Sequence, residues 1–295
     1  MIETTRPGGG ISRRPVSVPM KGGPMFHTET KHGVPLRISD ALDDPAIVHG
    51  FSTRLGGVSP APWDSLNLDD RRGDDLANVQ ENFRRLCAAL DVDVQRMVLS
   101  RQVHRDDVRT VTADDCGKGL WRMQDYDSAD ALITDETDIP LVVFSADCNV
   151  ILLHDPVRRA IGAAHAGWRG TALGIAAKAV RAMADTYGCD PSDIRAAVGP
   201  AIGQCCFETD GDVPAALRDA LGAQVEPFIS WNGRKYHIDL KSVNALWLQN
   251  AGVTHIDVCP DCTYCLSDLY WSHRRTGLSR GEQAAVICLK GEGTP

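Results

Sequence analysis

Residues 146–171 read ADCNVILLHDPVRRAIGAAHAGWRGT, and the rest of the chain is organised around them. Two apolar segments, residues 150–154 and 160–164, predict neighbouring strands. Cys148 stands just before the first segment and His165 just after the second, so a thiol and an imidazole are expected together at strand ends. The glycines after His165 are expected to open a helix, whose free backbone N–H groups can face an anion.

Hydrophobic patterning in the rest of the chain predicts both strands and helices. Because strands and helices do not alternate strictly, the pattern favours a single α+β domain with mixed β-sheets. Apolar residues at helical spacing predict a helix from Asp74 or Asp75 to about Leu90, and further helices over residues 171–187, 213–221 and 240–251. Short apolar runs predict strands over residues 35–38, 97–103, 108–111 (paired with 97–103), 131–134, 141–145, 194–198, 255–258, 269–272 and 284–289.

Composition narrows the class of protein. The chain has 295 residues, 43% of them hydrophobic, with a net charge of -8. This charge argues against a general nucleic-acid surface but still allows a small anionic ligand. No apolar run approaches the roughly 18 residues of a membrane helix, and no apolar secretory h-region follows the N-terminal arginines. We therefore expect a cytoplasmic protein whose ten cysteines are mainly reduced thiols.

Residues 1–24 are rich in glycine, proline and arginine and lack apolar periodicity. Such a composition cannot bury a core, so these residues are predicted to form a disordered tail. Residues 25–295 are then expected to form the single catalytic domain.

Further short motifs accompany the central stretch in a defined order. Together with ADC and HAGWRGT, they resemble the YfiH family, once labelled polyphenol-oxidoreductase laccases, over about residues 48–287. The motifs are HGFSTRLGGVS (residues 49–59), LNL (66–68), GD (73–74), QVH (102–104), DALIT (130–134), GPAIG (199–203), CFE (206–208), CTYC (262–265) and SHRR (272–275).

This resemblance implies a fold and an activity. The implied fold is a layered α/β/β/α arrangement, similar to that of a bacterial toxin deamidase (CNF-like) domain. The implied activity is zinc-dependent phosphorolysis of adenosine, inosine and methylthioadenosine to the free base and ribose 1-phosphate, together with deamination of adenosine to inosine. The expected partners are a small nucleoside and phosphate, without nucleic acid or membrane, and a monomer is favoured.

His104, Cys148 and His165 are the candidate metal ligands and catalytic residues. Zinc accepts nitrogen and sulfur ligands, and a catalytic site uses three protein ligands with the fourth position open. Separations of 44 and 17 residues are not a local metal motif, so the assignment follows from the resemblance, in which these positions form the zinc site. The alternative is a buried thiol beside two hydrogen-bonded histidines.

Arg54 is the first candidate for phosphate binding. It precedes two glycines in a long loop-like segment, residues 50–73. By spacing alone an exposed surface arginine is the commoner outcome, whereas the resemblance favours an anion-binding and catalytic role. Arg169 and the backbone after Gly199 are further candidates. Asp147 is expected to have a structural role, because alternation points it away from Cys148.

Cys259, Cys262 and Cys265 form two Cys-x2-Cys steps. A closed all-cysteine metal site needs a fourth ligand, and no second Cys-x2-Cys follows. We therefore interpret these cysteines as packing or pocket thiols, and a second metal site, a structural zinc or an iron–sulfur centre, stays open as the alternative. Only Cys262 and Cys265 belong to the motif that resembles the family, whereas Cys259 is an additional cysteine.

Three alternatives to the phosphorylase interpretation remain open. The old family label suggests a copper-dependent, laccase-like polyphenol oxidase, although none of the nine histidines occurs in a His-x-His pair, and a site of two histidines and one cysteine is typical of electron transfer. A cysteine hydrolase would use Cys148 with a histidine. A non-enzymatic, zinc-stabilised interaction protein would act in cell-wall or division pathways, since family members are linked to peptidoglycan editing.

Overall fold

The computed structural model describes residues 26–291. The predicted tail, residues 1–24, lies outside them, and the division into one domain stays a prediction. Two six-stranded sheets dominate the described part. The first has the order β1 (Phe26–Lys31), β2 (Val34–Ser39), β3 (Ile47–Ser52), β15 (Gln283–Leu289), β7 (Leu141–Ser145) and β4 (Val98–Leu99). The second has the order β14 (His255–Val258), β10 (Arg195–Val198), β8 (Asn149–Asp155), β9 (Ala160–Ala166), β6 (Ala131–Thr134) and β5 (Val108–Thr110).

Each large sheet is mixed, as the sequence predicted, because antiparallel pairs stand beside the parallel pairs β4–β7, β5–β6 and β10–β14. A small third sheet has the order β11 (Glu208–Thr209), β13 (Tyr236–Ile238) and β12 (Ile229–Trp231). The helices are α1 (Leu76–Leu90), α2 (Trp168–Ala172), α3 (Ile175–Tyr187), α4 (Asp212–Leu221), α5 (Leu240–Asn250) and α6 (His273–Thr276), with short 3₁₀ turns at Asp40–Leu42, Val94–Arg96, Ala113–Asp115 and Gly222–Phe228.

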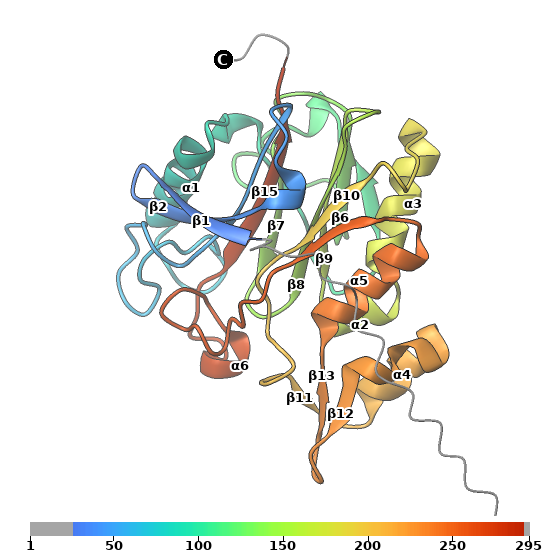
Figure 1. The fold of residues 1–295 in the computed structure, drawn as a ribbon. Coiled ribbons are helices and arrows are strands. Elements are labelled where there is room, and N and C mark those ends of the chain that lie inside the picture. The colour runs from blue at the N-terminus through green and yellow to red at the C-terminus, as the bar shows by residue number, and fades with distance from the viewer. Residues whose placement is uncertain (1–25, 292–295) are drawn as a thin grey trace, which may run out of the picture.

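The two large sheets pack face to face, and helices cover their outer faces (Figure 1). Alternate residues of a strand point to opposite faces, so Val143 of β7 faces the core between the sheets. Its neighbours Val142 and Phe144 face α1 instead. On the second sheet, Leu152 enters the central core while Ile151 packs with α3 and α5. The resulting layers are helix, sheet, sheet and helix; the likeness to a toxin deamidase fold stays a prediction.

Helix α1 illustrates how local sequence sets an element. Asp75 caps it by accepting a hydrogen bond from the Ala77 N–H at 2.9 Å. Val79, Phe83 and Leu86 then form a buried stripe against the first sheet. The helix ends where Asp91 adopts a left-handed conformation, with φ of 53°.

Four sequence predictions differ from the structure. Residues 97–103 form a strand only at Val98–Leu99, and Val108–Thr110 pairs with β6 in the other sheet. The predicted helix 171–187 is divided into α2 and α3, because Gly174 adopts a φ of 75° between them. Residues 269–272 form no strand. The backbone N–H of Trp271 instead donates a hydrogen bond to Gln283 Oε1 at 2.8 Å.

The crossover between the two sheets positions the site. β7 belongs to the first sheet and β8 to the second, and residues 146–148 connect them. Asp147 makes this turn with φ of 95°, a conformation that is strained for a residue with a side chain. Among the described helices, none combines the length and apolar character that crossing a membrane requires.

Candidate functional site

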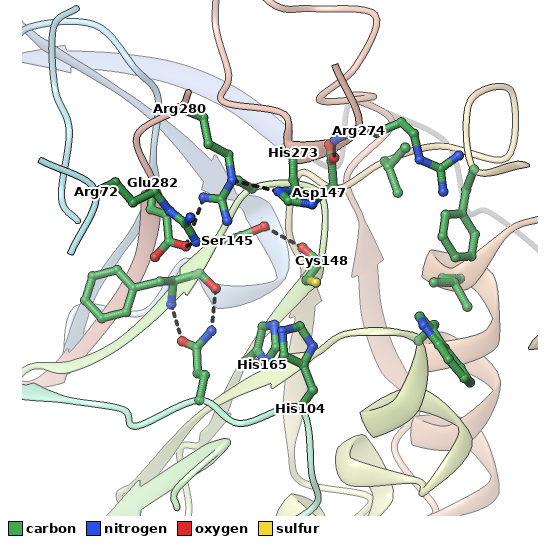
Figure 2. A pocket seen from close by; sticks show the side chains of 17 residues that line it. Arg72, His104, Ser145, Asp147, Cys148, His165, His273, Arg274, Arg280 and Glu282 are labelled. Carbon is green, nitrogen blue, oxygen red and sulfur yellow. Dashed lines mark hydrogen bonds and ion pairs between the residues drawn. The ribbon is translucent and has the colours of Figure 1, made fainter. Parts of the chain in front are cut away.

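Three side chains that are far apart in the sequence meet at the end of the second sheet. The ligand atoms of His104, Cys148 and His165 all lie within 4.8 Å of one another. The two imidazole rings have centroids 4.8 Å apart and stand nearly perpendicular, at 81°. Figure 2 shows the sulfur of Cys148 pointing toward both rings. The structure thus brings together the three residues that the family resemblance placed in one group.

Strand register explains why His165 and Cys148 are adjacent. In the antiparallel pair β8–β9, Val150 lies opposite His165 and Asn149 opposite Ala166. Cys148, one residue before β8, therefore lies beside the end of β9. His165 itself is only 2% exposed, so its imidazole is held by the sheet and not by solvent.

Asp130 connects the two histidines. Its Oδ1 lies 2.9 Å from His165 Nδ1, and its carboxylate accepts hydrogen bonds from the backbone N–H groups of Val103, His104 and Arg105 at 3.0 to 3.1 Å. The same carboxylate therefore orients one ring and fixes the loop that carries the other, where His104 has a φ of 61°. A carboxylate behind a histidine in this way is typical of metal sites, because it leaves Nε2 free for the metal.

Burial and close charges shift the pKa values of these groups. Burial by itself would lower the pKa of His165, but the Cys148 thiol and the Asp130 carboxylate raise it to about 9. Burial, together with repulsion by His165, lowers the pKa of His104. Burial would raise the pKa of Asp130, yet hydrogen bonds from His165 and the loop N–H groups hold it below its ordinary value. A metal takes up imidazole only in its neutral form, so binding here would release a proton.

Gly167 packs directly against this group. A Cβ atom at this position would lie 2.5 Å from His104 Nδ1 and 3.2 Å from Cys148 Sγ. The backbone conformation of Gly167 is ordinary, with φ of -62°, so only the close approach requires glycine. The glycine of the HAGWRG motif therefore makes room for the two side chains.

A cavity of about 370 Å³ opens above the three side chains, a size suited to a small organic ligand. Its lining has a basic part and an aromatic or aliphatic part, together with the polar or acidic residues Gln102, Ser145, Asp147 and Glu282. The basic residues are Arg72, His273, Arg274 and Arg280; the apolar residues are Phe144, Ala146, Trp168, Ile202, Phe207 and Leu240. The cavity can therefore receive a ligand that has both an anionic and a planar part.

Glu282 holds the two most enclosed arginines of the lining (Figure 2). Arg280 Nη1 donates to Glu282 Oε1 at 2.9 Å, and Arg72 Nη2 lies 3.8 Å from the same oxygen. Arg280 Nε also lies 3.4 Å from His273 Nδ1. Arg280 is 6% exposed and keeps only part of its donors occupied by protein, so the remaining N–H groups are available to an anion.

The position of Arg54 differs from its predicted role in phosphate binding, because this residue does not line the cavity. Its Nε and Nη2 donate to the Asp64 carbonyl oxygen at 2.9 and 2.8 Å, and its Nη1 donates to the Ser267 carbonyl oxygen at 3.0 Å. It also pairs with the Asp64 carboxylate at 3.2 Å and lies 3.9 Å above the Trp271 ring. These contacts occupy the guanidinium and join the loop after β3 to the C-terminal segment.

The other predicted anion ligands also lie elsewhere. Arg169 is exposed, stacks on Trp168 at 4.3 Å and lines a neighbouring surface hollow that shares Trp168, Phe207 and Arg274 with the cavity. Gly199 is a packing residue, since a Cβ there would lie 2.3 Å from the Phe51 ring. Asp147 has the expected structural contacts. Its carboxylate accepts hydrogen bonds from Thr263 Oγ1 and from the backbone N–H of Arg274, both at 2.6 Å.

Sequence reasoning missed part of the site. Arg72 and Arg280 line the cavity but stand outside every motif quoted for the family resemblance. Asp130 lies in the DALIT motif and Arg274 in the SHRR motif. Their presence in motifs of the family resemblance was the signal by which the sequence could have pointed to them as site residues. Cys262 and Cys265 do not line the cavity, so they are not pocket thiols. Cys262 packs in the apolar cluster of α4 and α5, in keeping with the packing interpretation, and both cysteines join Cys205 and Cys206 in a separate group.

Comparison with known proteins adds a family context. The family model described as multi-copper polyphenol oxidoreductase laccase matches residues 48–290. The chain is 40% identical over 254 residues to the purine nucleoside phosphorylase YlmD of Geobacillus stearothermophilus, covering 84% of this chain and 92% of that protein. It is 35% identical over 238 residues to the purine nucleoside phosphorylase YfiH of Escherichia coli, covering 81% and 92%. The crystal structure of a hypothetical protein YfiH from Bacillus licheniformis superposes with a TM-score of 0.83 at 35% identity, covering 91% of this chain and all of that one.

Proposed function

This chain belongs to the YfiH family, described as multi-copper polyphenol oxidoreductase laccase, and we propose that it acts as a purine nucleoside phosphorylase. The observation that carries the proposal is one cavity that joins the group His104, Cys148 and His165 to the basic residues Arg72 and Arg280. Relatives with 35–40% identity are named purine nucleoside phosphorylases. The proposed substrates are adenosine, inosine and methylthioadenosine.

In the proposed reaction, phosphate attacks C1′ of the ribose while the bond from C1′ to the purine breaks. The products are ribose 1-phosphate, or its methylthio analogue, and the free base. Phosphate is a dianion near neutral pH, so it needs positive charge and fixed donors to be held in line with the bond that breaks. We assign this role to Arg280 and Arg72, with His273 beside them. Trp168 and Phe207 offer planar faces for the purine.

The donor set of His104, Cys148 and His165 suits zinc, because it combines one thiol with two imidazoles, one of them backed by Asp130. When bound there, zinc would supply Lewis-acid stabilisation of negative charge on the departing base and activation of water for adenosine deamination. The protein's own contribution is to orient both rings, to deliver a thiolate and to keep the site within an enclosed cavity. Zinc, rather than copper, is part of this proposal.

Deamination of adenosine to inosine is proposed as a second reaction of the same cavity. It uses water and no phosphate, so it should not depend on Arg72 or Arg280 as an anion site. The two activities are therefore separable by residues on the basic side of the cavity.

The test is a nucleoside assay on the purified full-length chain, without a metal-affinity tag. Adenosine and inosine are incubated with and without phosphate, and the products are separated by liquid chromatography. We expect free base and ribose 1-phosphate only when phosphate is present, and inosine from adenosine in both cases. Oxygen consumption with a polyphenol and no base release would instead favour the laccase-like oxidase. Bound zinc without turnover of any of these substrates would favour a non-enzymatic protein.

A further inference from the structure

Four cysteines from two distant loops converge outside the cavity. Cys205 and Cys206 follow β10, whereas Cys262 and Cys265 follow β14. All four sulfur atoms lie within 4.8 Å of one another. Cys206 Sγ is 3.4 Å from Cys265 Sγ, and Cys205 Sγ is 3.8 Å from Cys265 Sγ. A sequence search for a second Cys-x2-Cys step could not find this group, because the missing ligands are two consecutive residues almost sixty positions earlier.

We propose that Cys205, Cys206, Cys262 and Cys265 bind a second, structural zinc ion. Zinc binds four thiolates tetrahedrally at about 2.3 Å, which places the sulfur atoms about 3.8 Å apart. The observed sulfur separations fit that arrangement. An iron–sulfur cluster fits less well, because its inorganic core separates the cysteine sulfurs more widely. Four protein ligands leave no open position, so the ion is structural and not catalytic.

The backbone around the group is arranged to support thiolates. The Gly203 N–H donates to Cys262 Sγ at 3.2 Å. The Gly203 carbonyl oxygen accepts from the N–H groups of Cys206 and Phe207, at 3.0 and 2.9 Å, and so closes a tight turn. A Cβ at Gly203 would lie 3.2 Å from Cys205 Sγ and 3.3 Å from Cys262 Cβ. The turn therefore presents two cysteines to the other loop and requires a small residue at its start.

Two arginines stand beside the group. Zinc with four thiolates carries a net charge of about -2, since four negative ligands surround a divalent cation. Arg274 Nη1 donates to the Cys206 and Glu208 carbonyl oxygens at 3.3 and 2.8 Å. Arg275 Nη1 donates to the Tyr264 carbonyl oxygen at 3.1 Å. These guanidinium groups partly offset the negative charge. Binding releases the four thiol protons and changes no oxidation state.

The position of the group suggests what the ion does. The first loop carries Ile202 and Phe207, and the second leads to His273 and Arg274, all of which line the cavity. Apart from hydrogen bonds such as that from the Thr263 N–H to the Ala201 carbonyl oxygen at 3.2 Å, little regular structure joins these loops. A shared zinc ion would hold this wall of the cavity in place. The inference does not depend on the proposed reaction.

Cys259 provides a matched control. It belongs to the same run of Cys-x2-Cys steps, yet it is fully buried in the core between the sheets and lies outside the thiol group. A variant at Cys259 therefore tests whether any cysteine of this segment matters for metal binding. Cys205 and Cys265 are exposed, so changing them to serine should disturb packing little.

The experiment measures zinc per chain by elemental mass spectrometry on the full-length protein, in a Cys148→Ala background that removes the other site. We expect one zinc per chain in this background, less than about a tenth of that after Cys205→Ser and Cys265→Ser together, and one again after Cys259→Ala. Cobalt in place of zinc should give the intense visible absorption of a tetrahedral tetrathiolate site. Circular dichroism would establish that the serine variant is folded.

Any of three results would overturn the inference. The first is a folded serine variant that keeps its zinc, and the second is a Cys148→Ala protein that binds none. The third is a thiol titration of the denatured chain without reductant that finds eight free thiols of the ten cysteines, because a disulfide within the group would then replace the metal. Since these readouts involve no nucleoside, failure here leaves the proposed phosphorylase activity untouched, and the reverse also holds.

Discussion

The Asp130 carboxylate lies 2.9 Å from Nδ1 of His165, and both residues are buried. This contact turns Nε2 of the imidazole toward Cys148 and, through the backbone hydrogen bonds of the same carboxylate, fixes the loop that carries His104. The metal-binding geometry proposed here therefore depends on a residue that touches no metal or substrate.

Asp130→Asn should weaken zinc binding about 10- to 100-fold, because an amide no longer strengthens the imidazole ligand or fixes its tautomer. The measurement is competition for zinc with a chelator of known affinity. Asp107→Asn is the control. The Asp107 carboxylate lies nearby and accepts a hydrogen bond from Ser128 Oγ at 2.5 Å, but it has no hydrogen bond to His104 or His165. Equal zinc affinity in both variants would remove Asp130 from this positioning role.

Gly167→Ala should displace His104 or Cys148, because the new methyl group would lie 2.5 Å from His104 Nδ1. We expect about a 100-fold loss of turnover together with weaker zinc retention, since displacement of about 1 Å at a reacting group has effects of that size. Gly211→Ala is the control, as its nearest neighbour would be Tyr236 at 4.0 Å. Full activity in Gly167→Ala would show that the group tolerates the movement.

Arg280→Ala should raise the KM for phosphate about 10- to 100-fold, because a charged hydrogen bond contributes roughly 1.5–3 kcal/mol. Deamination of adenosine, which uses no phosphate, should change much less. Arg280→Lys keeps the charge but not the forked donors, so it should recover part of the phosphate affinity. A parallel loss of both reactions would assign Arg280 to nucleoside positioning or to the loop.

Arg54→Ala should act mainly on stability. Its guanidinium donates to two carbonyl oxygens and stacks on Trp271, and leaving such acceptors without a donor costs about 1–3 kcal/mol. We expect a lower Tm and a phosphate KM within about threefold of the wild type. An unchanged Tm with a raised phosphate KM would restore the direct phosphate role that the sequence suggested.

Acid should destabilise the chain through His154. This residue is fully buried, neither of its ring nitrogens has a hydrogen-bond partner among the described residues, and burial lowers its pKa to about 4. In the unfolded chain His154 takes up a proton near pH 6.5, whereas in the folded chain it stays neutral down to about pH 4. The free energy of unfolding is therefore highest above pH 6.5 and decreases as the pH falls toward 4. The free energy of unfolding should decrease by roughly 2–3 kcal/mol over this range.

Urea unfolding across this pH range measures the effect. His154→Leu should make the pH dependence shallower without abolishing it, because the apolar side chain has no proton to gain while buried His49 still does. The exposed His32→Gln variant should keep the wild-type slope. An unchanged slope in His154→Leu would leave His49, whose pKa burial also lowers to about 4, as the responsible group.

Local patterns predicted most of the elements and the placement of Cys148 and His165 at adjoining strand ends. The stripe of Val79, Phe83 and Leu86 predicted α1, and the runs flanking Cys148 and His165 predicted strands that pair in register. The strand predicted over residues 97–103 was too long, and its predicted partner, residues 108–111, joins the other sheet. Apolar character alone indicates neither where a strand ends nor which sheet it joins. There Val98–Leu99 pairs with β7, and the chain then leaves the sheet to carry His104 toward Cys148.

By itself the sequence determined the family, the mixed α+β class, and the presence of a thiol and an imidazole at adjoining strand ends. Periodicity and turn residues act over a few positions, so a single chain segment contains that information. Only the tertiary structure decided that Arg54 is tied to Asp64, that Arg72 and Arg280 face the cavity, and that Cys205 and Cys206 join Cys262 and Cys265. Those contacts join segments up to about two hundred residues apart, and their proximity arises from how the two sheets stack and how the loops cross their ends.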